Sequence, residues 1–383
     1  MEVRIYKCLS ITVFLRYNRY SYFFSIRENG EYNMDQAHYA KLINEELNNL
    51  PIYVKEFYLA KNLSLTTKYQ YLTEIRRFFT WLIQENLSQA SSCKEIELKT
   101  LENLKREDVM LYIDSLRNKL NKQNKYNSPT TINRSINALR SLFHYLTVIA
   151  DNNNVEPYFY RNVMAKIESL PASQTLNYRA NEIQAHMYRG QMKHDFLNFL
   201  EERYEKENNG YVVGHFRKNK ERDIALIALM LGTGVRVQEA ANTNLKDLNV
   251  KQGMLSVTRK GGQRDAVPIA RWVVPYLVDY LEVRSKRYNP TEDQKALFLT
   301  TYRGKAKRIT SNAIESFVSK YSESFGRRLT PHKLRHTLAS ELYSETKDKV
   351  LVSQQLGQRG TSATDLYTHV DQTKQKDALN NIK

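Results

Sequence analysis

The chain of 383 residues carries 58 Lys and Arg against 41 Asp and Glu, which gives a formal net charge of +17 and an isoelectric point of about 9.5. Its length allows two domains, its 41% of hydrophobic residues suffices for buried cores, and its 13 Gly and 8 Pro are too few for a loop-rich or low-complexity protein. So basic a protein is expected to bind a polyanion, most often DNA or RNA, although charge alone also allows a basic protein without a nucleic-acid role.

Residues 1–33 are rich in Tyr, Phe and Arg and have no clear periodicity, whereas a regular helical pattern starts at Met34. Our hypothesis is that Met34 is the natural start and that residues 1–33 are an upstream read-through or a poorly ordered extension. The apolar stretch at 8–15 is short, is closed by Arg16 and lacks a cleavage site, which disfavours a signal peptide. Because this segment holds five basic and three acidic residues, removing it lowers the net charge only from +17 to +15.

No apolar run approaches the roughly 20 residues that span a membrane, so we expect no membrane partner. The two cysteines, Cys8 and Cys93, show no Cys-x-x-Cys or Cys/His spacing. We therefore expect neither a disulfide framework nor a zinc site. Both observations fit a cytoplasmic protein.

Residues 35–172 are predicted to be mostly helical. One helix covers 64–84, a second starts at Arg106, and a third starts near Ser128 and runs to Leu146. Basic residues on these helices either line a solvated face or contact phosphates, and because the whole chain is basic we favour DNA contact for the set. The set is Lys68, Arg76, Arg77, Arg134 and Arg140.

The segment 170–175 contains a proline and lacks helical periodicity, which predicts a linker between domains at 34–172 and 173–383. The second part is predicted to be chiefly helical, with an apolar helix at 223–231 that ends at the glycines of 232–234 and a further helix that opens at 235. Residues 253–269 alternate in polarity and fold back at Gly261 and Gly262, which predicts a β-hairpin. The predicted fold class is mainly α with a small antiparallel sheet.

Three groups of residues in the second part suggest chemistry. Arg236 and Glu239 share a helix face beside a glycine break, and Lys260 lies on the tight hairpin turn. Taken alone, each is better explained as a surface ion pair or a solvated lysine. His332, Arg335 and His336 follow one another on one helical face, where an arginine fork binds two phosphate oxygens and a histidine bonds a third or moves a proton.

Attack on a phosphodiester needs a nucleophile, cations that neutralise the phosphate oxygens, and an acid for the leaving oxygen. The chain supplies all three without a metal ion, and no acidic cluster resembles a magnesium site, so we expect no cofactor. The residues concerned are Arg236, Lys260, His332, Arg335 and, as nucleophile, Tyr367.

These segments resemble the tyrosine site-specific recombinases, the lambda-integrase-type family. The similar segments, in matching order and spacing, are 233–240 (Thr-Gly-Val-Arg-Val-Gln-Glu-Ala), 258–262 (Thr-Arg-Lys-Gly-Gly), 332–337 (His-Lys-Leu-Arg-His-Thr), 356–357 (Leu-Gly) and 365–369 (Asp-Leu-Tyr-Thr-His). The resemblance covers essentially all of 35–383. Within the family, segments 156–163 and 219–223 look most like the Xer recombinases that act as a single protein and resolve chromosome dimers at a dif-type site.

The resemblance implies specific roles. Tyr367 would form a 3′-phosphotyrosyl link, Arg236 and Arg335 would bind the scissile phosphate, Lys260 would protonate the 5′-oxygen, and His332 would assist as acid and base. The supporting residues would be Glu239 and His336.

The same resemblance implies an architecture and partners. A helical core-binding domain and a catalytic domain would form a C-shaped clamp on double-stranded DNA. Four copies would act on two duplexes without ATP, with the tail 371–383 docking on a neighbour. A DNA translocase of the FtsK type would be a further partner.

One position departs from the family pattern. Nine residues before Tyr367, where His or Trp is usual, stands Gln358. Its amide still donates a hydrogen bond but carries no positive charge, so we expect slowed cleavage. The alternatives are an integrase of a mobile element, a catalytically impaired DNA-binding paralogue, and a type IB topoisomerase, of which the recombinase fits the motifs best.

Overall fold

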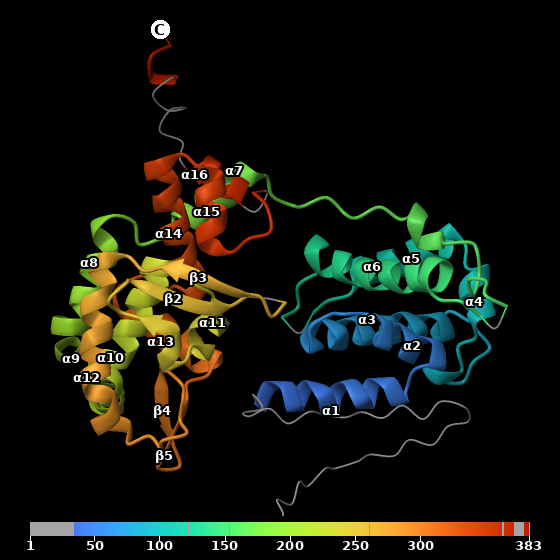
Figure 1. The fold of residues 1–383 in the computed structure, drawn as a ribbon. Helices are drawn as coiled ribbons and strands as arrows, with labels where there is room; N and C mark the ends of the chain where they lie inside the picture. Colours follow the sequence, from blue (N-terminus) through green and yellow to red (C-terminus); the bar gives the residue numbers. More distant parts are fainter. Residues whose placement is uncertain are drawn as a thin grey trace, which may run out of the picture. The chain divides into compact units, whose positions relative to one another are not determined.

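The computed structural model describes residues 34–121, 123–152, 154–259, 261–361, 364–370 and 379–382 (Figure 1). The chain divides into two compact units between Ala172 and Ser173. The hypothesis about residues 1–33 lies outside the described residues, as does most of the tail after Val370.

The first unit is helical. Its α-helices are α1 (Met34–Asn48), α2 (Ile52–Ala60), α3 (Leu65–Gln84), α4 (Leu98–Asn103), α5 (Arg106–Asn118) and α6 (Pro129–His144). Its short turns are the 3₁₀ helices η1 (Cys93–Glu95) and η3 (Val163–Lys166) and the π-helical turn η2 (Tyr145–Ile149).

Helices α1, α3, α5 and α6 begin where the sequence predicts, whereas α2 and α4 were not predicted. The hydroxyls of Ser64 and Ser128 accept hydrogen bonds from the backbone amides of Thr67 and Thr131, each at 3.3 Å, and so cap α3 and α6. The apolar faces of these helices meet in a core that includes the fully buried rings of Phe78, Phe79 and Phe143. The unit therefore has a hydrophobic core of its own.

As far as the structure describes it, the second unit contains helices and two small sheets. Its α-helices are α7 (Leu176–Gln184), α8 (Gln191–Asn198), α9 (Tyr204–Glu207), α10 (Gly210–Thr233), α11 (Val237–Asn242), α12 (Val274–Tyr288), α13 (Ser311–Ser324), α14 (Pro331–Thr346), α15 (Lys349–Leu356) and α16 (Asp365–Val370). Its strands are β1 (Leu248–Asn249), β2 (Met254–Thr258), β3 (Arg264–Pro268), β4 (Leu299–Tyr302) and β5 (Lys305–Arg308), and its short turns are η4 (Phe199–Arg203), η5 (Leu245–Asp247) and η6 (Arg271–Val273).

The predicted hairpin is present. Strands β1, β2 and β3 form one antiparallel sheet, and Thr258 pairs with Arg264, so the chain turns over residues 259–263. Strands β4 and β5 form a second, two-stranded sheet. The predicted fold class, mainly helical with a small antiparallel sheet, is confirmed.

Helix α10 is longer than the sequence pattern indicated, because it begins at Gly210 rather than near residue 223. Its apolar part, residues 224–231, is buried on every side, so it is the central helix of the second core. The part before it is largely polar and shows little amphipathic periodicity, which is why the sequence did not reveal it. In the part of the chain that the structure describes, no helix has the length and apolarity needed to cross a membrane.

Candidate active site

The break between α10 and α11 is a left-handed glycine. Gly234 has a φ of +68°, and a Cβ atom there would lie 2.8 Å from a methyl group of Leu356 and 2.9 Å from one of Leu338. Glycine therefore permits both the conformation and the close approach of α14 and α15. The carbonyl oxygen of Gly234 is free to accept a hydrogen bond from Arg335.

Arg236 and Glu239 form the first turn of α11. One carboxylate oxygen of Glu239 accepts from the Arg236 side chain at 2.8 Å, and the other accepts from the Arg236 backbone amide at 2.8 Å. Glu239 is buried, whereas the Arg236 side chain is 39% exposed. The buried carboxylate therefore holds in place a guanidinium that faces solvent.

Arg335 lies on α14 and is almost completely buried. Its two terminal nitrogens donate to the carbonyl oxygens of Gly234, at 2.5 Å, and Leu356, at 2.7 Å, and so join the ends of α10 and α15. Burial and the nearby Arg236 lower the pKa of Arg335 to about 10, against the opposing effect of Glu239. Arg335 is still cationic at neutral pH.

Tyr367 contacts the histidine that follows Arg335. The Tyr367 hydroxyl lies 2.9 Å from Nδ1 of His336, and the His336 ring in turn meets the ring of His332 edge to face at 4.4 Å between centroids. His336 and Tyr367 are buried, whereas His332 is exposed. The predicted face of α14 is therefore a row of contacts in which exposed His332 touches buried His336, and His336 touches Tyr367.

Burial shifts the protonation of these groups. It raises the pKa of Tyr367 to about 12, although Arg335 opposes the shift. Burial, together with His332, Lys333 and Arg335, lowers the pKa of His336 to about 3. Desolvation and the cation of Arg335 also lower the pKa of His332. At neutral pH His336 is thus uncharged, and in the tautomer with its proton on Nε2 it accepts the hydrogen bond that the phenol donates.

Helix α16 holds Tyr367 through contacts on two sides. Leu366 and Val370 pack against Ala180 of α7, and Lys349 of α15 pairs with Asp365 at 2.8 Å. Tyr367 itself packs in a small cluster with Val352 and Leu356 of α15 and Ala339 of α14. The helix is short, so tertiary packing rather than propensity fixes it.

Gln358 follows the left-handed glycine that ends α15. Its backbone amide donates to the carbonyl oxygen of Ser353 at 3.0 Å, but its side-chain oxygen is buried and has no hydrogen-bond partner among the described residues. A buried amide oxygen without a partner costs free energy. Among the described residues, the Gln358 side-chain oxygen is therefore left without the hydrogen bond that a buried amide oxygen normally accepts.

The hairpin turn contains one predicted residue and one that was not predicted. Lys260 lies outside the described residues, although its neighbours Arg259 and Gly261 are described. Arg259 is a residue that the sequence pattern did not single out. Its side chain is buried and pairs with Glu239, at 2.9 Å, and with Asp265, at 2.9 Å.

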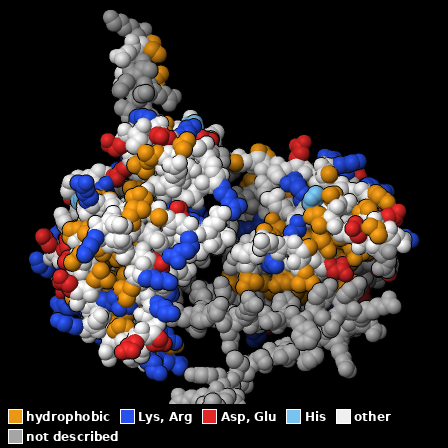
Figure 2. Space-filling view, viewed as in Figure 1, with side chains coloured by type: hydrophobic (Ala, Val, Ile, Leu, Met, Phe, Trp, Pro, Cys, Tyr) orange, Lys and Arg blue, Asp and Glu red, His pale blue; other side chains and the backbone are white. Residues whose placement is uncertain are grey.

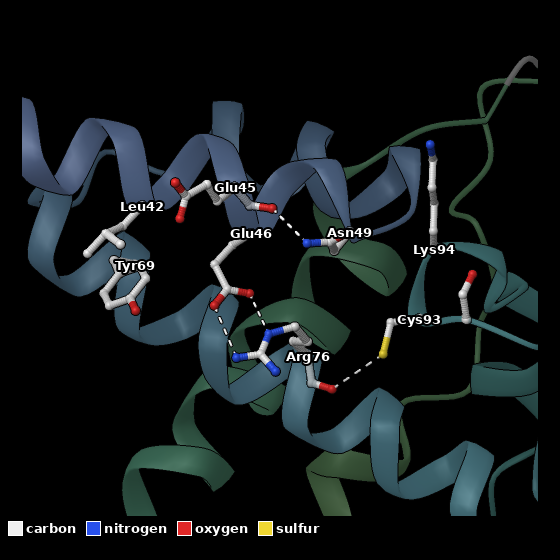
Figure 3. A pocket seen from close by; sticks show the side chains of 9 residues that line it. Leu42, Glu45, Glu46, Asn49, Tyr69, Arg76, Cys93 and Lys94 are labelled. Carbon is white, nitrogen blue, oxygen red and sulfur yellow. Dashed lines mark hydrogen bonds and ion pairs between the residues drawn. The ribbon is translucent and has the colours of Figure 1, made fainter.

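The basic residues predicted to bind DNA in the first unit differ in their surroundings. Arg76 pairs with Glu46 at 2.6 Å, beside a pocket of about 490 Å³ between α1, α3 and η1 (Figure 3). Arg77 pairs with Glu74 at 2.9 Å, and Arg140 donates to the carbonyl oxygen of Ile167 at 2.7 Å.

The two remaining predicted residues, Lys68 and Arg134, carry no such ion pair with any residue that the structure describes. Lys68 lies over the ring of Tyr58, 4.3 Å from its centroid, and Arg134 is exposed. Lys and Arg side chains are spread over the visible face of both units (Figure 2). Contact of the five residues with DNA stays a prediction.

Comparison with known proteins identifies the family. The model of the phage integrase family matches residues 203–374, and that of the phage integrase N-terminal SAM-like domain matches residues 51–148. The tyrosine recombinase XerS of Streptococcus gordonii is 47% identical over 340 residues, which cover 87% of this chain and 96% of that protein. XerS of Streptococcus thermophilus is 47% identical over 347 residues, 89% of this chain and 98% of that protein.

The chain belongs to the phage integrase family of tyrosine recombinases. As a tyrosine recombinase it is an enzyme that breaks and rejoins DNA, which confirms the predicted enzyme class. The resemblance inferred from the motifs is confirmed as well.

Solved structures of other tyrosine recombinases share the fold. The XerH recombinase in a post-cleavage complex with a palindromic difH substrate aligns with a TM-score of 0.57 at 22% identity, over 83% of this chain and 79% of that one. The Tn1549 transposon integrase in complex with transposon right end DNA aligns with a TM-score of 0.56 at 16% identity, over 86% of this chain and 98% of that one. At this identity the likeness supports the fold of the tyrosine recombinase and no more.

Proposed function

We propose that this recombinase cuts and rejoins DNA at a dif-like chromosomal site through a 3′-phosphotyrosyl intermediate, and so resolves chromosome dimers. The observation that carries the chemistry is the meeting of α14 and α16, where the hydroxyl of Tyr367 lies 2.9 Å from His336, the residue next to Arg335. A nucleophile, a buried arginine and a partly exposed arginine are thus gathered in one region of one unit.

In the proposed reaction the Tyr367 oxygen attacks the scissile phosphorus and loses its proton. The bond from phosphorus to the 5′-oxygen breaks, and that oxygen leaves with a proton from Lys260. Arg236 and Arg335 neutralise the phosphate oxygens as the charge develops. Rejoining reverses these steps, and the covalent link stores the phosphodiester energy, so ATP is not needed.

The remaining residues support these steps. Glu239 orients Arg236, His336 holds the tyrosine hydroxyl, and His332, at the exposed end of α14, exchanges protons with the phosphate or solvent. Gln358 donates a hydrogen bond to the phosphate through its amide. A metal ion or other cofactor has no role in the proposed steps.

The proposed partners follow from the relatives. XerS proteins nearly half identical over most of this chain favour a chromosomal role over that of a mobile-element integrase. The proposed assembly is a homotetramer on two duplexes, in which residues 34–172 bind core DNA, residues 173–383 cut it and the tail 371–383 docks on a neighbour. A DNA translocase of the FtsK type and a cytoplasmic location complete the proposal.

A suicide substrate tests the chemistry. The wild type is expected to form a covalent protein–DNA adduct on a nicked half-site duplex, and Tyr367→Phe is expected to form none while binding the same DNA. Sequencing the chromosomal DNA trapped by Tyr367 tests the biological role. Adducts confined to a mobile element would favour the integrase, and no adduct at any site would indicate the catalytically impaired paralogue.

A further inference from the structure

Arg259 stands at the end of strand β2, where the hairpin turns, yet only 8% of its surface is exposed. Arginines at hairpin turns are usually solvated, and burying a guanidinium is costly unless its donors are paired. The contacts of Arg259 must therefore account for its burial.

The guanidinium of Arg259 binds three separate segments of the second unit. Nη1 donates to Glu239 of α11 at 2.9 Å, Nε donates to Asp265 of β3 at 2.9 Å, and Nη2 donates to the carbonyl oxygen of Gln355 of α15 at 3.2 Å. A planar guanidinium presents its donors in fixed directions, so three such bonds determine the position of the group. The end of the hairpin is thereby fixed against α11 and α15.

The carboxylate of Glu239 is shared between two arginines. Its Oε1 pairs with Arg236 at 2.8 Å, and its Oε2 pairs with Arg259 at 2.9 Å. One buried carboxylate therefore sets the position of the hairpin relative to an arginine proposed to bind the scissile phosphate.

Gly357 packs directly on the same guanidinium. A Cβ atom at this position would lie 2.2 Å from Nε and 2.4 Å from Cζ of Arg259, and Gly357 also has a φ of +58°. Since three bonds tether the guanidinium, it cannot move aside cheaply. Glycine is thus needed at position 357 for two reasons: a side chain would collide with the Arg259 guanidinium, and the backbone has a left-handed conformation.

We propose that Arg259 is a positioning residue for protonation of the leaving 5′-oxygen. Lys260 is the next residue of the chain, so the bonds that fix Arg259 fix the residue to which the lysine is covalently joined. Only this covalent adjacency of Lys260 enters the inference, which rests on the proposed role of Lys260 as the acid. The competing explanation is an ion-pair network that merely stabilises the fold.

A substrate with sulfur in place of the bridging 5′-oxygen separates these explanations. When the Tyr367 oxygen bonds to phosphorus, the phosphorus–sulfur bond breaks and the thiolate leaves with the electron pair, because a thiolate is stable enough to depart without a proton. The sulfur substrate therefore restores variants that are impaired only in leaving-group protonation.

Arg259→Ala is expected to cleave the all-oxygen suicide substrate roughly 10-fold to 100-fold more slowly than the wild type, and the sulfur substrate at a nearly unchanged rate. Arg259→Lys keeps a cation but loses the forked guanidinium, so its rate on the all-oxygen substrate should lie between those of the wild type and Arg259→Ala. Lys260→Ala should be restored by sulfur in the same way, whereas Arg236→Ala should not. Equal slowing of Arg259→Ala on both substrates would overturn the proposal.

Gly357→Ala provides a second, independent variant if Arg259→Ala fails to fold. It should displace the guanidinium and show the same recovery on the sulfur substrate. Gly360→Ala is its matched control, since Gly360 shares the loop and a positive φ of +99° but a Cβ there meets nothing within 4 Å. A Gly357→Ala variant that behaves like Gly360→Ala on both substrates would contradict the proposal.

Failure of the underlying mechanism gives a different result. If Lys260→Ala is not restored by sulfur while Arg259→Ala is, the acid is another residue, and the proposal that Arg259 acts by positioning Lys260 is overturned while cleavage by Tyr367 stands. If Tyr367→Phe still forms the adduct, the proposed function itself is wrong.

Discussion

A buried hydrogen bond joins Tyr367 to a histidine that stays neutral at physiological pH. Burial, with His332 and the cations of Lys333 and Arg335, holds the pKa of His336 at about 3. A neutral imidazole is an acceptor of unchanging strength between pH 6 and 8, which keeps the phenol in one orientation while its own pKa of about 12 keeps it protonated.

This histidine makes stability depend on pH. The unfolded chain protonates His336 below about pH 6.5, whereas the folded chain does so only near pH 3, so stability is full above 6.5 and is lost as the pH falls. Lowering the pH from 7.5 to 5.5 should cost about 1 kcal/mol through this residue. Denaturant unfolding at both pH values should show that loss reduced by this amount in His336→Gln, and an equal loss in both proteins would contradict the prediction.

Gln358 permits a test of its unusual side chain. Because its buried amide oxygen has no partner among the described residues, a histidine there gives up no hydrogen bond of that oxygen to them, and it would add a cationic donor for the phosphate of the proposed reaction. Single-turnover cleavage by Gln358→His should be as fast as or faster than that of the wild type. Gln358→Leu, similar in size but without a donor, is the control and should be slower. A clearly slower Gln358→His would contradict this account.

Contacts between residues close in sequence could be predicted, whereas contacts between residues far apart in sequence could not. Helical spacing predicted that His332 and His336 share a face, and their rings are in contact. The ion pair of Arg76 with Glu46 joins residues of different helices. Nothing in the local sequence indicates that pairing, and nothing there shows that Arg259 is buried. Such pairings depend on tertiary packing.

At the scale of elements, the join between α10 and α11 brings the candidate arginines together. Gly234 ends α10, its carbonyl accepts from Arg335, and Arg236 follows two residues later. The sequence indicated this break because glycine interrupts an apolar run, and it indicated the hairpin because polarity alternates with period two. It missed the first part of α10, where neither signal is present.

Gly234→Ala tests this join. The new methyl group would collide with Leu356 and Leu338, and the left-handed backbone would be strained, so we expect a loss of roughly 2 to 4 kcal/mol in unfolding free energy and slower cleavage. Gly214→Ala is the control, since Gly214 lies within α10 and a Cβ there meets nothing within 4 Å. It should be neutral or stabilising by up to about 1 kcal/mol. Equal stability of the two variants in thermal melts would contradict the prediction.

At the scale of the whole molecule, the chain consists of two units with separate cores and unequal charge. Residues 34–172 hold 18 Lys and Arg against 15 Asp and Glu, whereas residues 173–383 hold 35 against 23. The second unit therefore carries most of the positive charge. Each unit has its own cluster of buried apolar residues, so each should fold when expressed alone.

The charge difference predicts how DNA affinity depends on salt. Every phosphate that a unit neutralises releases counterions and steepens the fall of the binding constant with salt concentration. The isolated unit 173–383 should retain most of the salt dependence of the full chain, and unit 34–172 should show a shallow one.

Joined in one chain, the units should bind a site roughly 100-fold more tightly than either alone, because the second contact becomes intramolecular. Fluorescence anisotropy over a salt series measures all three proteins, with an equimolar mixture of the separate units as control. A steeper slope for unit 34–172 would contradict the prediction that unit 173–383 makes most of the phosphate contacts. A mixture that binds as tightly as the intact chain would contradict the predicted gain from joining the units.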